Sequence, residues 1–303
     1  MRGKPGPSSS MILYTTVLLF VLLLCWGPGQ HLEFAERVWR RRREMLPRDV
    51  ALLLSEEREA YYYGNLAADI IHFKSYRGAY SHCHKWTIIG VMRERAKTPR
   101  EEAFILGYLS HLAADTIAHN HFVPYHLARY ARTKGLGHLY WEMSADRFVP
   151  VGRWGIVSEL KARPELFDLD ELINDAVPEK ALSMRTNKMI FNHVLLVSER
   201  ERWRHGVARL HPIGEVDLRK GFLAIFQDAA VDRIRLALHP KGMREICRVD
   251  PNGKDAQKAA MSARTRLVHR IVPRRMKTEE SEEIAAKFLL GMESPPPQSE
   301  AAA

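Results

Sequence analysis

The residues best suited to chemistry are three polar side chains on an otherwise apolar segment, GYLSHLAADTIAHNHF, residues 107–122. His111, Asp115 and His119 are spaced four residues apart, and we call them the ladder. In a helix each such step advances about 6 Å and turns the side chain by only about 40°, so all three line one face. Imidazole and carboxylate suit zinc, and a carboxylate between two histidines has two oxygens with which to bridge two cations. Because burying three polar groups without partners would be costly, the spacing predicts a metal-binding face.

Further candidate ligands surround the ladder. Nine of the 14 histidines lie between residues 31 and 138. His138 and Glu142 repeat the four-residue spacing behind a glycine-rich stretch. A single pair of this kind also arises on a solvated helix face, and Asp69 and His82 taken alone would be a helix-end carboxylate and a surface histidine. Together with the ladder they favour a metal site.

The elements that must position these residues are helices. Helical periodicity is common along the chain and strand-like alternation is scarce, which predicts an all-α fold. The apolar stripe of residues 31–39 points His31 inward at the first turn of a helix. We predict further helices near residues 79–95, 100–119, 138–150, 176–199, 216–238 and 278–291. We expect one helical domain over residues 26–290, with the metal site within 26–150.

Residues 1–25 have the pattern of an export signal. Basic residues precede a 14-residue apolar run, Met11 to Leu24, which is too short to span a hydrocarbon core of about 30 Å comfortably. Cleavage after Cys25 would make Trp26 the amino terminus. Small residues are preferred at the recognition positions of such a site, and Leu23 and Cys25 fit this preference imperfectly. Two alternatives therefore stay open: an uncleaved membrane anchor, or lipidation of Cys25. We expect an exported protein, periplasmic or secreted.

The chain is basic, with a formal net charge of +10 that becomes +8 if residues 1–25 are removed. The balance suggests attraction to phosphate-rich partners such as lipid headgroups or nucleic acid, but it says nothing about the fold. Residues 291–303 are polar and rich in proline, and we expect a disordered tail there.

In their order along the chain, these residues resemble the zinc-dependent phospholipase C family. The resemblance rests on His31 after a short turn, Asp69 in GNLAADI, His82 in HCHKW, the ladder, and the pair His138 and Glu142. The fungal zinc single-strand nucleases and the catalytic domain of glycosylphosphatidylinositol phospholipase D look similar in this order. The likeness covers roughly residues 26–150.

The resemblance implies a cluster of up to three zinc ions. One ion would be held by Asp69, His82, His111 and Asp115, a second by His119, His138 and Glu142, and a third by His31, Asp115 and the amino-terminal Trp26. Trp26 would bind through its free amine and its carbonyl. This gives the Gly-Pro-Gly turn at residues 27–29 a purpose, which is to fold the newly freed amine back toward His31.

Two ligand positions stay open. His84 competes with His82, and Lys85 stands where family members often carry Asp or Asn. The spacing in the bacterial enzymes selects His121, whereas the ladder spacing and the phospholipase D relative select His119, which we prefer. The four residues between Trp26 and the first histidine are also fewer than in the bacterial enzymes.

The resemblance implies phospholipase C-type hydrolysis of phospholipids by a metal-activated water, with Asp69 as a ligand or as a general base. Tyr61 to Tyr63 could line a headgroup pocket or belong to the core. The alternatives are a zinc single-strand nuclease, favoured by the basic charge although no platform for base stacking is evident, and a non-catalytic, membrane-anchored zinc protein, favoured if the leader is retained.

Overall fold

The computed structural model describes residues 27–72, 83–130, 136–199, 218–271 and 273–293. These ranges contain helices and no strand, so the all-α prediction is confirmed. None of the helices in the described ranges is long and apolar enough to cross a membrane. The longer helices are α2 (Pro28–Arg40), α4 (Arg48–Glu56), α5 (Arg58–Ala67), α6 (Thr87–Arg95), α7 (Pro99–Ile117), α8 (Val123–Tyr130), α9 (Leu136–Asp146), α10 (Val151–Lys161), α12 (Met184–Glu199), α14 (Lys220–Ala237), α16 (Lys254–His269) and α17 (Arg274–Ala286).

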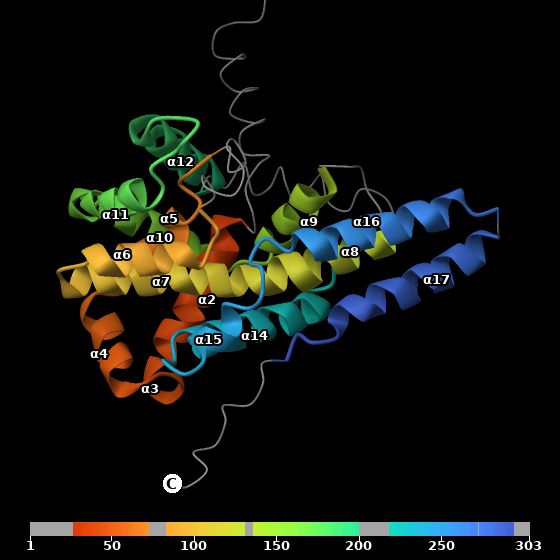
Figure 1. The fold of residues 1–303 in the computed structure, drawn as a ribbon, viewed down its shortest axis with the longest axis horizontal. Coiled ribbons are helices and arrows are strands. Elements are labelled where there is room, and N and C mark those ends of the chain that lie inside the picture. Colours follow the sequence, from red (N-terminus) through yellow and green to blue (C-terminus); the bar gives the residue numbers. More distant parts are fainter. Residues whose placement is uncertain (1–26, 73–82, 131–135, 200–217, 272, 294–303) are drawn as a thin grey trace, which may run out of the picture.

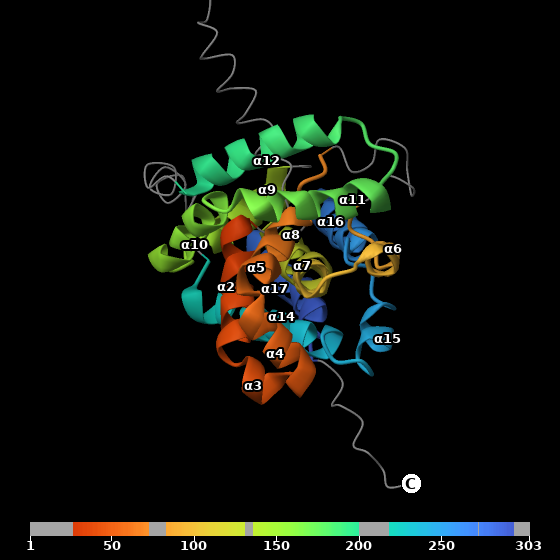
Figure 2. The same cartoon turned by 90° about the vertical axis from the view of Figure 1, so that its left-hand side faces the viewer.

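Helix α7 is the central element. It begins with a capping box, in which the Thr98 hydroxyl accepts the Glu101 N–H and the Glu101 carboxylate accepts the Thr98 N–H. From residue 103 onward every side chain of α7 is buried. Helices α11 (Asp170–Ala176) and α12 lie on one side of it, and α14 and α15 (Met243–Ile246) lie on the other (Figures 1 and 2). The ladder therefore runs through the middle of the molecule.

Two glycines allow α5 to cross α7 at close range. A Cβ atom added to Gly64 would stand 2.0 Å from the Phe104 carbonyl oxygen, and one added to Gly107 would stand 2.1 Å from the Tyr61 carbonyl oxygen. Both distances are far below van der Waals contact, so only glycine fits. This approach brings the end of α5, and Asp69 just beyond it, against the ladder.

The predicted helix 100–119 does not end at the ladder. Residues Ala118–Phe122 continue it as a π-helical segment, η2, which leads directly into α8. Pro124 lies near the start of α8, and because it has no N–H and its ring crowds the carbonyl four residues earlier, the preceding turn must widen. The wider turn sets the direction of His119, and such segments are frequent at functional sites.

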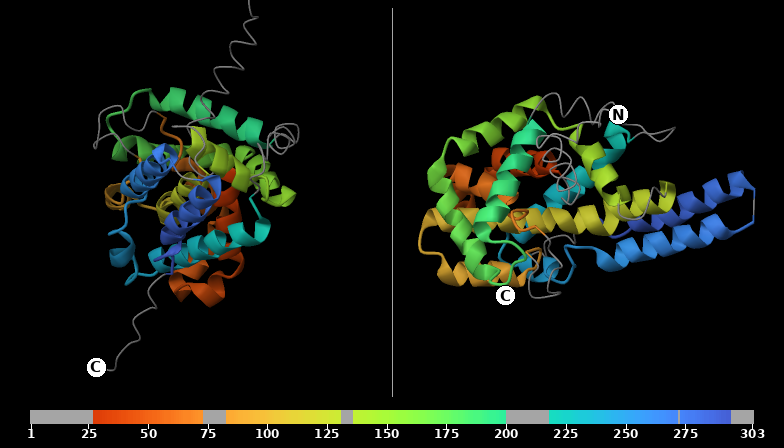
Figure 3. Two further views of the ribbon diagram at one scale, coloured as in Figure 1. Left: turned by 90° about the vertical axis from the view of Figure 1, so that its right-hand side faces the viewer. Right: turned by 90° about the horizontal axis from the view of Figure 1, so that it is seen from above.

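Other helix boundaries differ from the predictions for local reasons. The predicted helix 176–199 begins only at Met184, because Pro178 restricts the residue before it and cannot continue a helix. Helix α16 was not predicted at all. Only Ala260 and Leu267 are buried in it, so its sequence carries too few apolar positions to show a helical period. Together α16 and α17 form a hairpin that extends away from the body (Figure 3).

The tyrosine run belongs to the core. Tyr61, Tyr62 and Tyr63 are all buried, and each hydroxyl has a polar partner. The Tyr62 hydroxyl donates to Glu36 on α2, whose other oxygen accepts from Arg40 at 2.6 Å. Burial alone would raise the pKa of the Glu36 carboxyl, but these two hydrogen bonds and the charges of Arg153 and Arg40 together outweigh it and hold the pKa below its ordinary value of 4.5.

The depressed pKa of Glu36 predicts an acid-sensitive contribution to stability. A carboxyl with a lowered folded-state pKa stabilises the fold above pH 4.5 and loses that contribution as the pH falls through the folded-state pKa. We expect Glu36→Gln to lower the free energy of unfolding at pH 7 by about 1–3 kcal/mol. The gap to wild type should then shrink as the pH falls below 4.5. Urea unfolding across this range measures both, and a gap independent of pH would contradict the assignment.

Candidate metal centre

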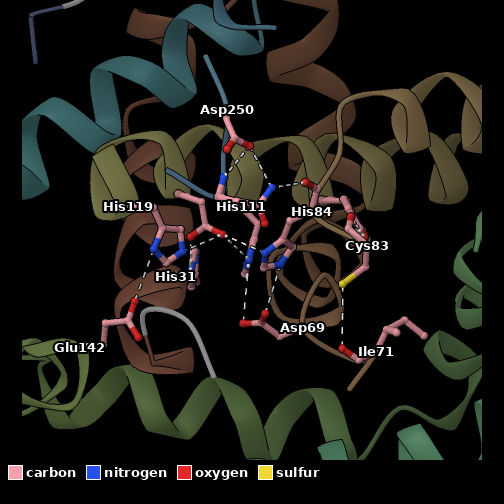
Figure 4. Close-up of polar contacts among 12 residues, drawn as sticks. His31, Asp69, Ile71, Cys83, His84, His111, His119, Glu142 and Asp250 are labelled. Carbon is pink, nitrogen blue, oxygen red and sulfur yellow. Dashed lines mark hydrogen bonds and ion pairs between the residues drawn. The ribbon is translucent and has the colours of Figure 1, made fainter. Parts of the chain in front are cut away.

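Asp115 is the hub of a buried polar cluster. Figure 4 shows how His31, His84, His111 and His119 converge within it. The Oδ1 atom of Asp115 lies 3.5 Å from His31 Nε2. Its Oδ2 lies 3.3 Å from His111 Nε2, 3.4 Å from His84 Nδ1 and 3.7 Å from His119 Nε2. These four histidines come from α2, the segment before α6, α7 and η2. A single carboxylate thus faces imidazoles from four parts of the chain, and all five side chains are buried.

Asp69 closes one side of this cluster. Its Oδ1 lies 3.2 Å from His84 Nε2 and its Oδ2 lies 3.9 Å from His111 Nε2. The other ring nitrogen of His111, Nδ1, lies 2.8 Å from the Asn65 carbonyl oxygen. A carbonyl only accepts, so Nδ1 carries the proton and Nε2 presents its lone pair to the cluster. Asp69 and Asn65 both belong to the GNLAADI segment, so one turn of chain supplies a carboxylate and orients an imidazole.

A second group adjoins the first at the other end of the ladder. His119 Nδ1 lies 3.8 Å from Glu142 Oε1, and both residues are buried. His138 lies on α9, one turn before Glu142, but its side chain is outside what the structure describes. Trp26 and His82 also lie outside the described residues. Their assignment as ligands stays a prediction.

The chemistry of the donors suits a cation. Burial alone would raise the pKa of the Asp115 carboxyl, but the charges of His111 and His119 outweigh it and hold the pKa well below 3.8. Burial and the neighbouring His111 lower the pKa of His31 to about 3, so its ring is neutral. Neither Asp115 oxygen accepts a hydrogen bond from any residue within the described ranges. A buried carboxylate faced by several imidazoles is the arrangement that a divalent cation would stabilise.

Subsets of these residues already meet at ligand spacing. In two groups, His31 with Asp69 and His111, and His84 with His111 and Asp115, one ligand atom from each residue lies within 4.8 Å of the others. His84 is therefore in the cluster. His121, by contrast, is half-buried and its Nδ1 donates to the Phe288 carbonyl at 2.8 Å. The geometry favours His119 over His121.

Asp146 was not singled out in the sequence, yet it anchors the helix that carries His31. Its Oδ1 accepts the Gln30 N–H at 3.0 Å, while the Gln30 side chain donates to the Ala145 carbonyl at 2.7 Å. Desolvation raises the pKa of the Asp146 carboxyl to about 7 against the effect of the Gln30 N–H. A Cβ on Gly27 would stand 1.8 Å from Asp146 Oδ2, so the first turn of α2 is seated directly on α9. The sequence did carry a signal for Asp146, because this residue continues the four-residue spacing of His138 and Glu142.

A loop far along the chain also supports the cluster. The Asn252 side chain donates to the His84 carbonyl at 2.9 Å. Gly253 has φ +56°, and a Cβ there would stand 2.0 Å from the His119 carbonyl oxygen. Asp250 orients Asn252 by accepting its backbone and side-chain N–H groups, each at 3.0 Å. Nothing in the sequence signals this contact, because it joins residues more than 130 positions apart to the ladder and to His84.

The comparisons with known proteins agree with this geometry. A family model described as zinc dependent phospholipase C matches residues 30–182, half of the chain. No curated protein and no solved structure matches the chain significantly. The matched region holds the described part of the cluster, from His31 to Glu142, and ends before the loop at residues 250–253. The chain belongs to the zinc-dependent phospholipase C family.

Proposed function

We propose that this protein is a zinc-dependent phosphodiesterase that hydrolyses phospholipids in the manner of a phospholipase C. The observation that carries the proposal is the buried carboxylate of Asp115, faced by four imidazoles and without a hydrogen bond from the described residues. Burial of this carboxylate is not compensated by a hydrogen bond from the described residues. We infer that the site serves to bind cations.

We assign the zinc ligands in three groups, with up to three ions. The first is Asp69, His111, Asp115 and one of His82 and His84, and the distances favour His84; the second is His119, His138 and Glu142; the third is His31, Asp115 and Trp26. The shared use of Asp115 is supported by its position, since its two oxygens face different histidines.

The bound zinc would lower the pKa of a water molecule toward neutrality and neutralise charge on the phosphoryl oxygens of the substrate. The chain supplies the orientation. Asn65 holds the His111 tautomer, Asn252 holds the backbone of His84, and Asp146 seats the helix of His31. Asp69 is 7 % exposed, whereas Asp115 is wholly enclosed. Of these two carboxylates only Asp69 has any contact with solvent, and we assign it as ligand or general base.

Export and removal of residues 1–25 complete the proposal. Cleavage after Cys25 would free the Trp26 amine one residue before Gly27, whose Cα the structure places against Asp146. The first turn of α2 is thus held at a fixed point beside α9, which also carries Glu142. A short turn from this point would let the new amino terminus enter the third ligand group.

The activity assay uses zinc-loaded exported protein, a short-chain phosphatidylcholine and single-stranded DNA. We expect phosphocholine release from the lipid, lost on treatment with a chelator and restored by zinc, because the metal supplies the nucleophile. Hydrolysis of DNA without hydrolysis of the lipid would select a nuclease instead. Zinc bound without hydrolysis of either substrate would select a non-catalytic zinc protein, and a retained leader would make that protein membrane-anchored.

A further inference from the structure

The hairpin of α16 and α17 ends in a surface that the metal centre does not use. The two helices pack along α8, and their far end lies at one extreme of the molecule (Figures 1 and 3). We call residues 264–271 and 273–277 the hairpin end. It comprises the last turns of α16, the described residues of the connection and the first turn of α17, and it lies outside the residues that match the family model.

Large apolar side chains are exposed at the hairpin end. Ile271, in the connection between the helices, is fully exposed, and Val268 and Met276 beside it are each 50 % exposed. Single apolar residues on a surface need no explanation, but three within nine positions at a protruding point form a patch. Such a patch costs solubility unless it meets an apolar partner.

The hairpin end also carries a dense positive charge. It contains six Lys and Arg residues and no Asp or Glu. Two of these cations form ion pairs with glutamates of α17. Arg270 pairs with Glu280, and Arg275 pairs with Glu279. These pairs are exposed to solvent, where salt bridges contribute little. Arg266 is exposed and has no ion pair with any described residue. The apolar patch is therefore bordered by cations.

We propose that the hairpin end docks on an anionic lipid bilayer, with Ile271 entering the interface between headgroups and acyl chains and the surrounding arginines contacting lipid phosphates. The proposal rests on the proposed phospholipid-hydrolysing function. Apolar side chains ringed by Lys and Arg are the composition of interfacial membrane anchors, and anionic leaflets attract such basic segments. Nucleic acid would use the cations but leave Ile271 in water, and a second copy of this basic hairpin would be repelled.

The base of the hairpin links this surface to the metal centre. Gly253, directly before α16, packs against the His119 carbonyl, and the Phe288 carbonyl, just after α17, accepts from His121. Both ends of the hairpin are thus tied to η2, the segment that carries His119. Docking of the far end would hold the metal centre at a constant distance from the bilayer surface.

Vesicle co-sedimentation of the zinc-loaded exported chain tests the proposal. Vesicles of phosphatidylcholine with about 30 % phosphatidylglycerol are compared with vesicles of pure phosphatidylcholine at low and high salt. The measurement is made at low temperature and over a short time, so that hydrolysis does not change the lipid composition. We expect tighter binding to the anionic vesicles and about tenfold weaker binding for Ile271→Ser, because one buried Ile side chain is lost from the interface. Arg266→Gln should weaken binding to the anionic vesicles about fivefold at low salt.

The matched control is Val151→Ser, which removes a side chain that is 70 % exposed on α10, away from the hairpin. It should bind vesicles as wild type does. All variants should hydrolyse a monomeric short-chain lipid at the wild-type rate, because that reaction needs no docking. Unchanged vesicle binding by Ile271→Ser would overturn the proposal. So would a result in which Arg266→Gln weakens binding to DNA but leaves binding to anionic vesicles unchanged. Vesicle binding through the hairpin end without any lipid hydrolysis would overturn the proposed function and leave the docking surface intact.

Discussion

Asp115→Asn is expected to lower lipid hydrolysis by at least about 10³-fold, because two of the three proposed zinc groups share Asp115 and would lose the charge that a bound metal requires. The substitution keeps the size of the side chain and removes only the anion that faces His31, His84, His111 and His119. Zinc content, measured on the purified variant, should fall together with activity.

The effect of zinc on stability separates a ligand from a structural residue. Because His111 and His119 hold the pKa of Asp115 low, Asp115→Asn is expected to lower the stability of metal-free protein as well, so each variant is compared with and without zinc. Zinc should raise the melting temperature of wild type but not of the variant. Asp170→Asn is the control, since Asp170 is also buried but is bonded to Tyr63 and Lys188. That variant should lose stability and keep its zinc. The reverse pattern would show that Asp115 serves the fold.

Gly107→Ala is expected to destabilise the protein by about 3 kcal/mol, because the added methyl group must displace the Tyr61 carbonyl of α5. The melting temperature should fall by on the order of 10 °C. Since α5 leads into Asp69 and its Asn65 carbonyl accepts from His111, separation of the two helices should also weaken zinc binding. Thermal unfolding and zinc titration measure the two effects.

Gly90→Ala is the matched control for this substitution. Gly90 also lies within a helix, α6, but an added Cβ meets nothing within 4 Å. Its replacement should leave stability unchanged or raise it slightly, by about 0.4–1 kcal/mol, because alanine restricts the unfolded chain. Equal losses in the two variants would mean that helix crossing at Gly107 is not the cause.

The part of the site that local periodicity controls was predictable. His111, Asp115 and His119 fall on one face because four-residue spacing has that meaning in any helix. The approach of Asp69, and of His82 or His84, to that face was inferred from the order of residues in a known family. The structure brings Asp69 and His84 to Asp115 or its neighbours, and His82 lies outside the described residues. The choice between neighbouring histidines needed coordinates, because His119 and His121 differ only in the direction set by the π-helical turn.

The supporting contacts could not be predicted, since they depend on distant segments. Asn252 and Gly253 meet His84 and His119 only because α16 packs along α8 and η2. Helix α16 itself buries too few apolar residues to reveal a helical period. The Asp146 contact lay within reach of the spacing argument, but its role depends on how closely Gly27 allows α2 to approach α9.

The most direct test of the central claim is anomalous diffraction at the zinc edge from crystals of the zinc-loaded exported chain. We predict zinc peaks beside Asp115, between it and His31, His84, His111 and His119, with the amino terminus at Trp26. Diffraction that shows these side chains ordered with no zinc among them, or zinc bound only elsewhere, would contradict the account.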